Sequence, residues 1–103
     1  MKQPLEQARL YLQKASEDEV LLTKIVDDLE VSDNIFGFHA QQAVEKLLKA
    51  LLSSKNVRFK KTHNLRELMD LLSEAGMSLP EPVSDIDFLT PYGALARYDN
   101  LPI

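Results

Sequence analysis

The 103-residue chain has no cysteine and only two histidines, and each scarcity excludes a kind of site. Without cysteine the chain can form neither a disulfide nor a thiolate metal site. Two histidines without a carboxylate cluster beside them make a weak case for a metal. We therefore expect no metal and no cofactor.

Long apolar runs are also absent. No stretch approaches the roughly 20 apolar residues that a membrane span requires, and residues 1–4 lead into polar sequence rather than a signal-peptide core. A hydrophobic content of 45% argues against disorder, and a net charge of −4 is modest. These features predict one folded domain, residues 1–103, that is cytoplasmic and makes no contact with a membrane.

No segment alternates apolar and polar residues as a strand would, whereas helical spacing recurs along the chain. The predicted helices run from Pro4 to about Leu29, from about Ile35 to Ser54, from Leu65 to near Gly76, and over residues 83–98, where Pro91 predicts a kink or a restart. Asn64 and Glu67 have the spacing of a capping box at the start of the third helix. The apolar spacing of the first helix predicts that its inner side consists of Leu5, Ala8, Leu12, Ala15, Leu22, Ile25 and Leu29. The sequence therefore predicts an all-α fold, an antiparallel up-and-down bundle of four helices.

The second predicted helix carries two distinct stripes. Its apolar stripe consists of Phe36, Ala40, Ala43, Val44, Leu47 and Leu51, and its polar border consists of His39, Gln42, Lys46 and Lys49. The small residues Ala43 and Ala50 would let another helix approach closely. From this surface we expect a homodimer.

Charge is distributed unevenly along the chain. Residues 46–66 carry seven Lys and Arg residues and no acid, whereas residues 1–45 carry nine acids and residues 67–103 carry seven. Such a basic block attracts phosphates at short range, even on an acidic molecule. A solvated helix end with a lysine-rich loop would have the same composition. The pattern alone leaves both interpretations open.

Three segments of the chain together form a pattern: residues 38–51 (FHAQQAVEKLLKAL), residues 62–68 (THNLREL) and residues 96–98 (ARY). In sequence, order and spacing they resemble the HEPN domain, a helical domain often found beside minimal nucleotidyltransferases. The resemblance implies a helical bundle that dimerises. It also implies a minimal nucleotidyltransferase as partner in a two-component pair, which in some members is a toxin–antitoxin system.

The chain departs from the ribonuclease members of that family at its end. Those members resemble one another in an Arg followed about four to six residues later by a His, but no His follows Arg97 here. The family also continues into a further helix, so we expect that this chain is truncated at its C-terminus. The missing His argues against ribonuclease activity.

Two functions remain. The first is a non-catalytic module that holds a nucleotide or an RNA phosphate and works with a nucleotidyltransferase; the second is a metal-independent ribonuclease toxin with altered or missing catalytic residues. The candidate ligand-binding residues are Arg97, His39, Gln42, Lys46, Lys49, His63 and Tyr98, and no catalytic residue is assigned. Arg97 suits bidentate phosphate recognition but also an ion pair with an acid such as Glu45. His39 suits a helix–helix contact, and His63 a hydrogen bond at a helix start, as well as a ligand.

Overall fold

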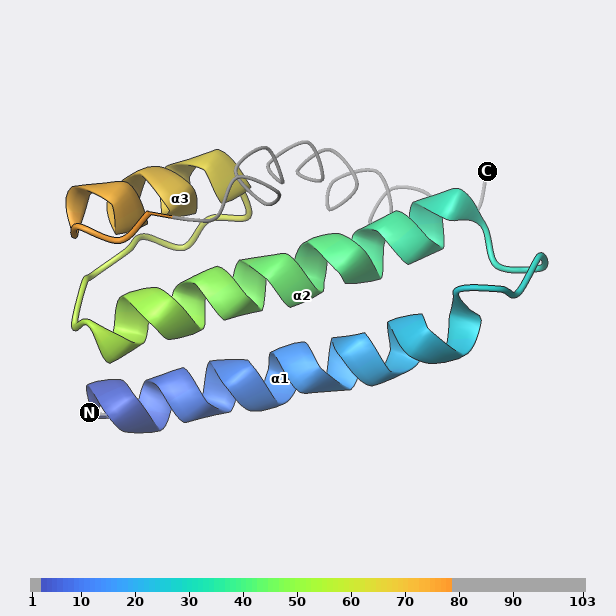
Figure 1. The fold of residues 1–103 in the computed structure, drawn as a ribbon, viewed down its shortest axis with the longest axis horizontal. Helices are drawn as coiled ribbons and strands as arrows, with labels where there is room; N and C mark the ends of the chain where they lie inside the picture. Colours follow the sequence, from blue (N-terminus) through green and yellow to red (C-terminus); the bar gives the residue numbers. More distant parts are fainter. Residues whose placement is uncertain (1–2, 79–103) are drawn as a thin grey trace.

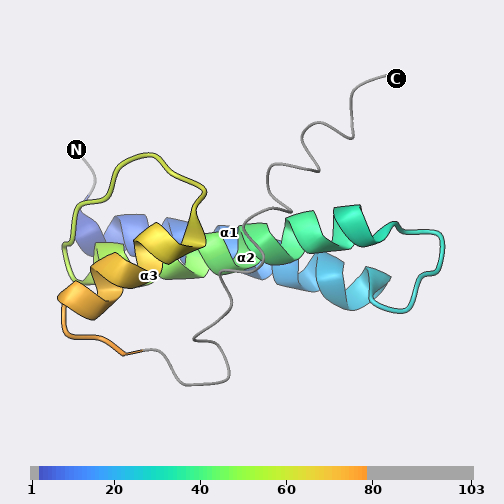
Figure 2. The ribbon, with the colours of Figure 1, turned by 90° about the horizontal axis from the view of Figure 1, so that it is seen from above.

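The computed structural model describes residues 3–78, which form three helices: α1 (Pro4–Ile25), α2 (Asp33–Ser54) and α3 (Leu65–Glu74). Helices α1 and α2 are antiparallel neighbours, and α3 lies on the other side of α2 (Figure 1). The connector between α2 and α3, residues 55–64, arches to one side of these helices (Figure 2).

The absence of strands among residues 3–78 confirms the all-α prediction. The predicted fourth helix, over residues 83–98, lies outside the described residues. A bundle of four helices therefore stays a prediction.

The first helix ends earlier than its apolar spacing predicted. It stops at Ile25 rather than Leu29, because the backbone turns there: Asp28 N–H donates to the Ile25 carbonyl at 3.0 Å, and Glu30 N–H to the Asp28 carboxylate at 2.9 Å. Helix α2 then starts at Asp33, two residues before the predicted Ile35. Its first turn is capped by the Ser32 hydroxyl, which accepts a hydrogen bond from Ile35 N–H.

Both α2 and α3 end in the same type of cap. After α2, Asn56 takes a positive φ of 57°, and Val57 N–H donates back to the Leu52 carbonyl at 2.9 Å. After α3, Gly76 has φ 87°, and Met77 N–H donates to the Leu72 carbonyl at 3.0 Å. These are Schellman motifs, in which a left-handed residue reverses the chain and the next side chain packs back on the core.

Helix α3 begins as its sequence predicts. The Asn64 side chain accepts hydrogen bonds from the amides of Arg66 and Glu67. In a capping box the Glu67 side chain would accept a hydrogen bond from the backbone N–H of Asn64. Here that N–H donates to the Thr62 hydroxyl instead, at 3.1 Å.

The core lies between α2 and α3. It consists of Leu48, Leu52, Leu65, Leu68, Met69 and Leu72. Helix α1 contributes mainly small residues, Ala8 and Ala15. The prediction that Leu5 and Leu12 point inward is wrong: they are 63% and 47% exposed, because α1 packs against α2 along a narrow strip of small side chains.

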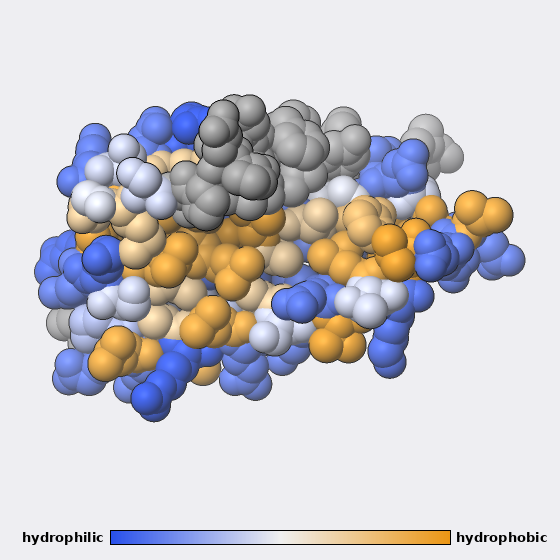
Figure 3. Space-filling model, in the orientation of Figure 1, coloured by the Kyte–Doolittle hydropathy of each residue, from blue (hydrophilic) through white to orange (hydrophobic). Residues whose placement is uncertain are grey.

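Apolar atoms consequently gather on one face across α1 and α2, which Figure 3 views directly. The exposed large apolar side chains of these helices include Leu5, Leu12 and Leu47. A surface of this kind is typical of a site of association.

Candidate functional site

The first polar cluster joins α1 to α2 around Asp18. One carboxylate oxygen lies 3.1 Å from His39 Nδ1, and the other accepts a hydrogen bond from Lys46 Nζ at 2.7 Å. Asp18 follows Ala15 by about one helical turn on the buried side of α1, so its carboxylate is largely shielded from water. The charge of Lys46 is therefore balanced within the fold.

The second polar cluster surrounds Glu45 and is more deeply buried. Glu45 accepts hydrogen bonds from Lys49 Nζ at 2.9 Å and from Gln41 Nε2 at 2.8 Å, and His63 Nδ1 lies 2.9 Å from the same carboxylate. Glu45 and Lys49 are 3% and 7% exposed. Their mutual contact and the extra hydrogen bonds compensate the cost of burying both charges.

The Gln41 amide holds this cluster to the connector. It is fully buried; its nitrogen also donates to the His63 carbonyl at 3.0 Å, and its oxygen accepts from Gln42 Nε2 at 2.7 Å. The amide is thus satisfied on both sides, and it fixes the connector against α2 at His63.

These contacts control the pKa of Glu45. Burial alone would raise it, but hydrogen bonds from Lys49, Gln41 and His63 stabilise the charged form, and the pKa lies below its ordinary value of 4.5. Glu45 is therefore an anion at neutral pH.

Lys49 extends the Glu45 cluster to α1. Its ammonium lies 5.9 Å from the centroid of the Phe59 ring, and that ring lies 6.1 Å from the ring of Tyr11 at a tilt of 55°. The connector is thereby held to α2 by Lys49 and to α1 by Tyr11.

Beside these rings is an open hollow of about 1040 Å³, bounded by the start of α1, the end of α2 and the connector. Its polar lining includes Lys49, Ser53, Arg58, Lys61 and His63, and no described carboxylate lines it. A hollow of this size and charge suits a small anionic ligand.

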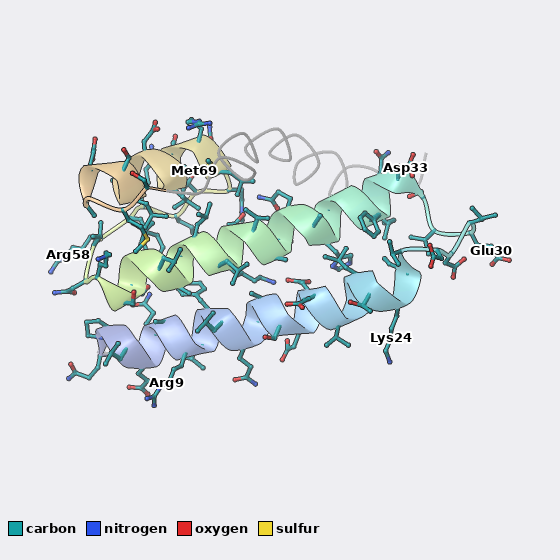
Figure 4. All side chains as sticks on the ribbon, in the orientation of Figure 1. Arg9, Lys24, Glu30, Asp33, Arg58 and Met69 are labelled. Carbon is teal, nitrogen blue, oxygen red and sulfur yellow. The ribbon has the colours of Figure 1, made fainter. Side chains whose placement is uncertain are left out.

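The hollow and the acidic turn between α1 and α2 lie at opposite ends of α1. Arg58 lies at the end where α1 begins, whereas Glu30 in the turn and Asp33 at the start of α2 lie at the other end, as does Lys24 (Figure 4). The turn also carries the exposed Asp27 and Asp28. The turn therefore repels an anion more than the hollow does, since no described carboxylate lines the hollow.

The structure places the predicted ligand-binding residues in different surroundings. His39 and Lys46 contact Asp18, while Lys49 and His63 contact Glu45 and also line the hollow. Gln42 supports Gln41. The other two candidates, Arg97 and Tyr98, lie outside the described residues. The predicted helix–helix contact of His39 is present as its bond to Asp18.

Sequence reasoning did not assign a role to Asp18 and named Glu45 only as an ion-pair alternative for Arg97, although these two carboxylates organise the clusters. Glu45 stands four residues from both Gln41 and Lys49, a spacing that brings side chains together on a helix. Asp18 occupies an inner position of α1, where an acid needs a partner. Both signals are in the sequence, but neither names the partner on another element.

The described residues form a small helical domain with a buried polar centre. The family profile of the HEPN domain matches residues 1–102, essentially the whole chain, and the chain belongs to that family. None of the curated proteins and none of the solved structures matches it significantly.

Two further properties concern residues 3–78. None of their helices is long and apolar enough to cross a membrane. No group of three or more His, Cys, Asp and Glu side chains among them is placed to hold a metal ion.

Proposed function

We propose that the chain is a non-catalytic HEPN module that binds a phosphate-bearing ligand, a nucleotide or RNA, and works with a nucleotidyltransferase in a two-component system. The observation that carries this proposal is the hollow, because it is lined by Lys49, Arg58, Lys61 and His63 and by no described carboxylate. Membership of the HEPN family supports it.

Two of these cations are available to a ligand. Lys49 is balanced by Glu45, whereas Arg58 and Lys61 are exposed and have no acidic partner among residues 3–78. The surplus positive charge of the hollow therefore comes from Arg58 and Lys61. The guanidinium of Arg58 offers bidentate contacts to phosphate, and Lys61 adds a point charge.

The test compares two double variants that remove the same charge. Arg58→Gln with Lys61→Gln should weaken binding of ATP or 5′-phosphorylated single-stranded RNA at least tenfold, since each lost charge-assisted hydrogen bond costs about 1.5–3 kcal/mol. Arg9→Gln with Lys24→Gln is the control, because these exposed side chains point away from α2 (Figure 4). Equal losses in both double variants, or no binding by the unaltered chain at low salt, would contradict phosphate binding at the hollow.

The non-catalytic part of the proposal is tested separately. No His follows Arg97 at the spacing of the ribonuclease members, and the two described histidines belong to separate carboxylate clusters, His39 with Asp18 and His63 with Glu45. Metal-free incubation with single-stranded RNA should therefore give no cleavage. Robust cleavage that is lost in Arg97→Ala, with the fold retained, would favour the ribonuclease toxin instead.

We further propose that the chain forms a homodimer through the apolar face of α1 and α2. The exposure of Leu12 and Leu47 supports this, since burying such side chains is favourable. Light scattering at tens of micromolar should give a dimer, and Leu12→Lys with Leu47→Lys should give a monomer. A monomeric unaltered chain would exclude the homodimer.

The nucleotidyltransferase partner is tested by coexpression. A short nucleotidyltransferase reading frame beside this gene should yield a protein that copurifies with the chain. Failure of the two proteins to associate would restrict the proposal to ligand binding.

A further inference from the structure

We propose that the hollow holds a single nucleotide, with its phosphates at Arg58 and Lys61 and its base against Tyr11, rather than a continuous RNA strand. This inference rests on the proposed function and specifies the ligand of the same site. It makes Tyr11 a residue that determines specificity, because phosphate-binding cations alone do not distinguish a nucleotide from any other polyphosphate.

The phosphate end of the site has support besides its two cations. The α1 helix begins at Pro4 in the wall of the hollow, and its N-cap residue, Gln3, makes no side-chain capping bond. Pro4 has no N–H, so the amides of Leu5 and Glu6 are the first that add partial positive charge to this wall, and the exposed Glu6 carboxylate offsets part of it. In the same wall, the buried Ser53 hydroxyl has no hydrogen-bond partner in the described structure. A hydroxyl of this kind gains a hydrogen bond when a ligand oxygen, or a water molecule bound to the ligand, occupies the hollow.

The aromatic end is formed by Tyr11 and Phe59. Both are half-buried and line the hollow, and their tilt of 55° makes an angled wall rather than a parallel stack. Phe59 is already engaged by the Lys49 ammonium. Tyr11 is therefore the ring that we assign to the base, and stacking of a base on an aromatic side chain contributes about 1–3 kcal/mol.

The charge distribution favours a single nucleotide over a strand. An RNA strand leaving the hollow along α1 and α2 would approach the acidic turn, with Asp27, Asp28 and Glu30. Lys46, midway along α2, is already paired with Asp18. The cations available to phosphate in the hollow are thus confined to one end of the described molecule, where a short ligand meets all of them.

Calorimetric titration with ATP, tripolyphosphate and circular single-stranded RNA tests this inference on the full chain. Tripolyphosphate carries no less charge than ATP but has no base, so charge alone predicts that it binds at least as tightly. We expect ATP to bind about tenfold more tightly than tripolyphosphate, and more tightly than the circular RNA, which has no end to insert. Tyr11→Leu should remove the preference for ATP over tripolyphosphate, whereas Tyr11→Phe, which keeps the ring, should retain it.

The outcomes separate this inference from the proposed function. Equal affinity for ATP and tripolyphosphate, or an unchanged preference in Tyr11→Leu, would overturn the assignment of the base to Tyr11 while phosphate binding stands. Circular RNA binding as tightly as ATP would replace the single nucleotide with a strand. No binding of any of the three probes would refute both proposals. A thermal melt of each variant checks that the fold is retained.

Discussion

Asp18 and Glu45 are both carboxylates set against helix α2, but their surroundings differ. Asp18 joins α1 to α2 through Lys46 and His39, whose side chains are about a quarter exposed. Glu45 is nearly inaccessible, and its partners Lys49 and His63 continue into the wall of the hollow. The difference teaches that the same pairing can serve two purposes: one cluster attaches a helix, and the other also shapes a candidate binding site.

The same comparison explains which cations remain available to a ligand. Lys46 and Lys49 have the sequence pattern of phosphate-binding residues, yet each neutralises a carboxylate of the fold. Arg58 and Lys61 lie on the connector, which Gln41 and Phe59 hold in place. The account therefore assigns stability to the buried cations and ligand binding to the exposed ones.

The largest expected effect is the removal of the Glu45 charge. Glu45→Gln should destabilise the fold by about 3–5 kcal/mol, because it leaves the buried Lys49 ammonium without its counter-charge. Denaturant unfolding followed by far-UV circular dichroism measures this loss. A second change, Lys49→Met, should recover part of it, since it removes the uncompensated charge. A loss as small as that of the exposed control Glu17→Gln would contradict the structural role of Glu45.

The removal of the Asp18 charge should have a smaller effect. Asp18→Asn weakens two charge-assisted contacts whose other partners still reach water, so we expect a loss of about 1–3 kcal/mol. The same unfolding measurement applies, with the exposed Glu19→Gln as the matched control. An effect equal to or larger than that of Glu45→Gln would reverse the order of the two clusters.

Acid should weaken the Glu45 cluster in a defined direction. The folded-state pKa of Glu45 is lower than its ordinary value of 4.5, so its stabilisation is fully present above that pH and is lost as the pH falls through the folded-state pKa. Unfolding free energies measured from neutral to acid pH should therefore fall more steeply for the unaltered chain than for Glu45→Gln. Parallel pH profiles for the two proteins would contradict this linkage.

The smallest expected effect is that of the connector cations on stability. Arg58→Gln with Lys61→Gln should change the unfolding free energy by no more than about 0.5 kcal/mol, since both side chains are exposed. Lys49 differs from them, because the single change Lys49→Met would leave the buried Glu45 carboxylate without the ammonium that neutralises it. A loss of several kcal/mol in the double variant would show that these cations also support the fold.

Local signals in the sequence predicted much of the fold. The cap at Asn64 and the glycine at Gly76 gave the limits of α3 closely, because both signals act within one helical turn. Leu5 and Leu12 were misassigned because periodicity shows that a face is apolar but does not show how much of it a neighbouring helix covers. The early end of α1 arises from turn hydrogen bonds at Asp28, which apolar spacing does not register.

The candidate site was predicted less completely. The positions of His39, Lys46 and Lys49 on one border of α2 followed from the helical period. Their pairing with Asp18 and Glu45 did not, because it depends on how α1 and the connector dock. The hollow likewise joins residues 3–11 with residues 49–63, which only the fold brings together.

The most direct test of this division between structural and ligand-binding cations is a nuclear magnetic resonance titration of the isotope-labelled chain with ATP. The account predicts chemical-shift changes at Ser53, Arg58 and Lys61, around the hollow, while the signals of Asp18 and Lys46 stay in place. Shifts centred on Asp18, His39 and Lys46, with Arg58 and Lys61 unaffected, would contradict it.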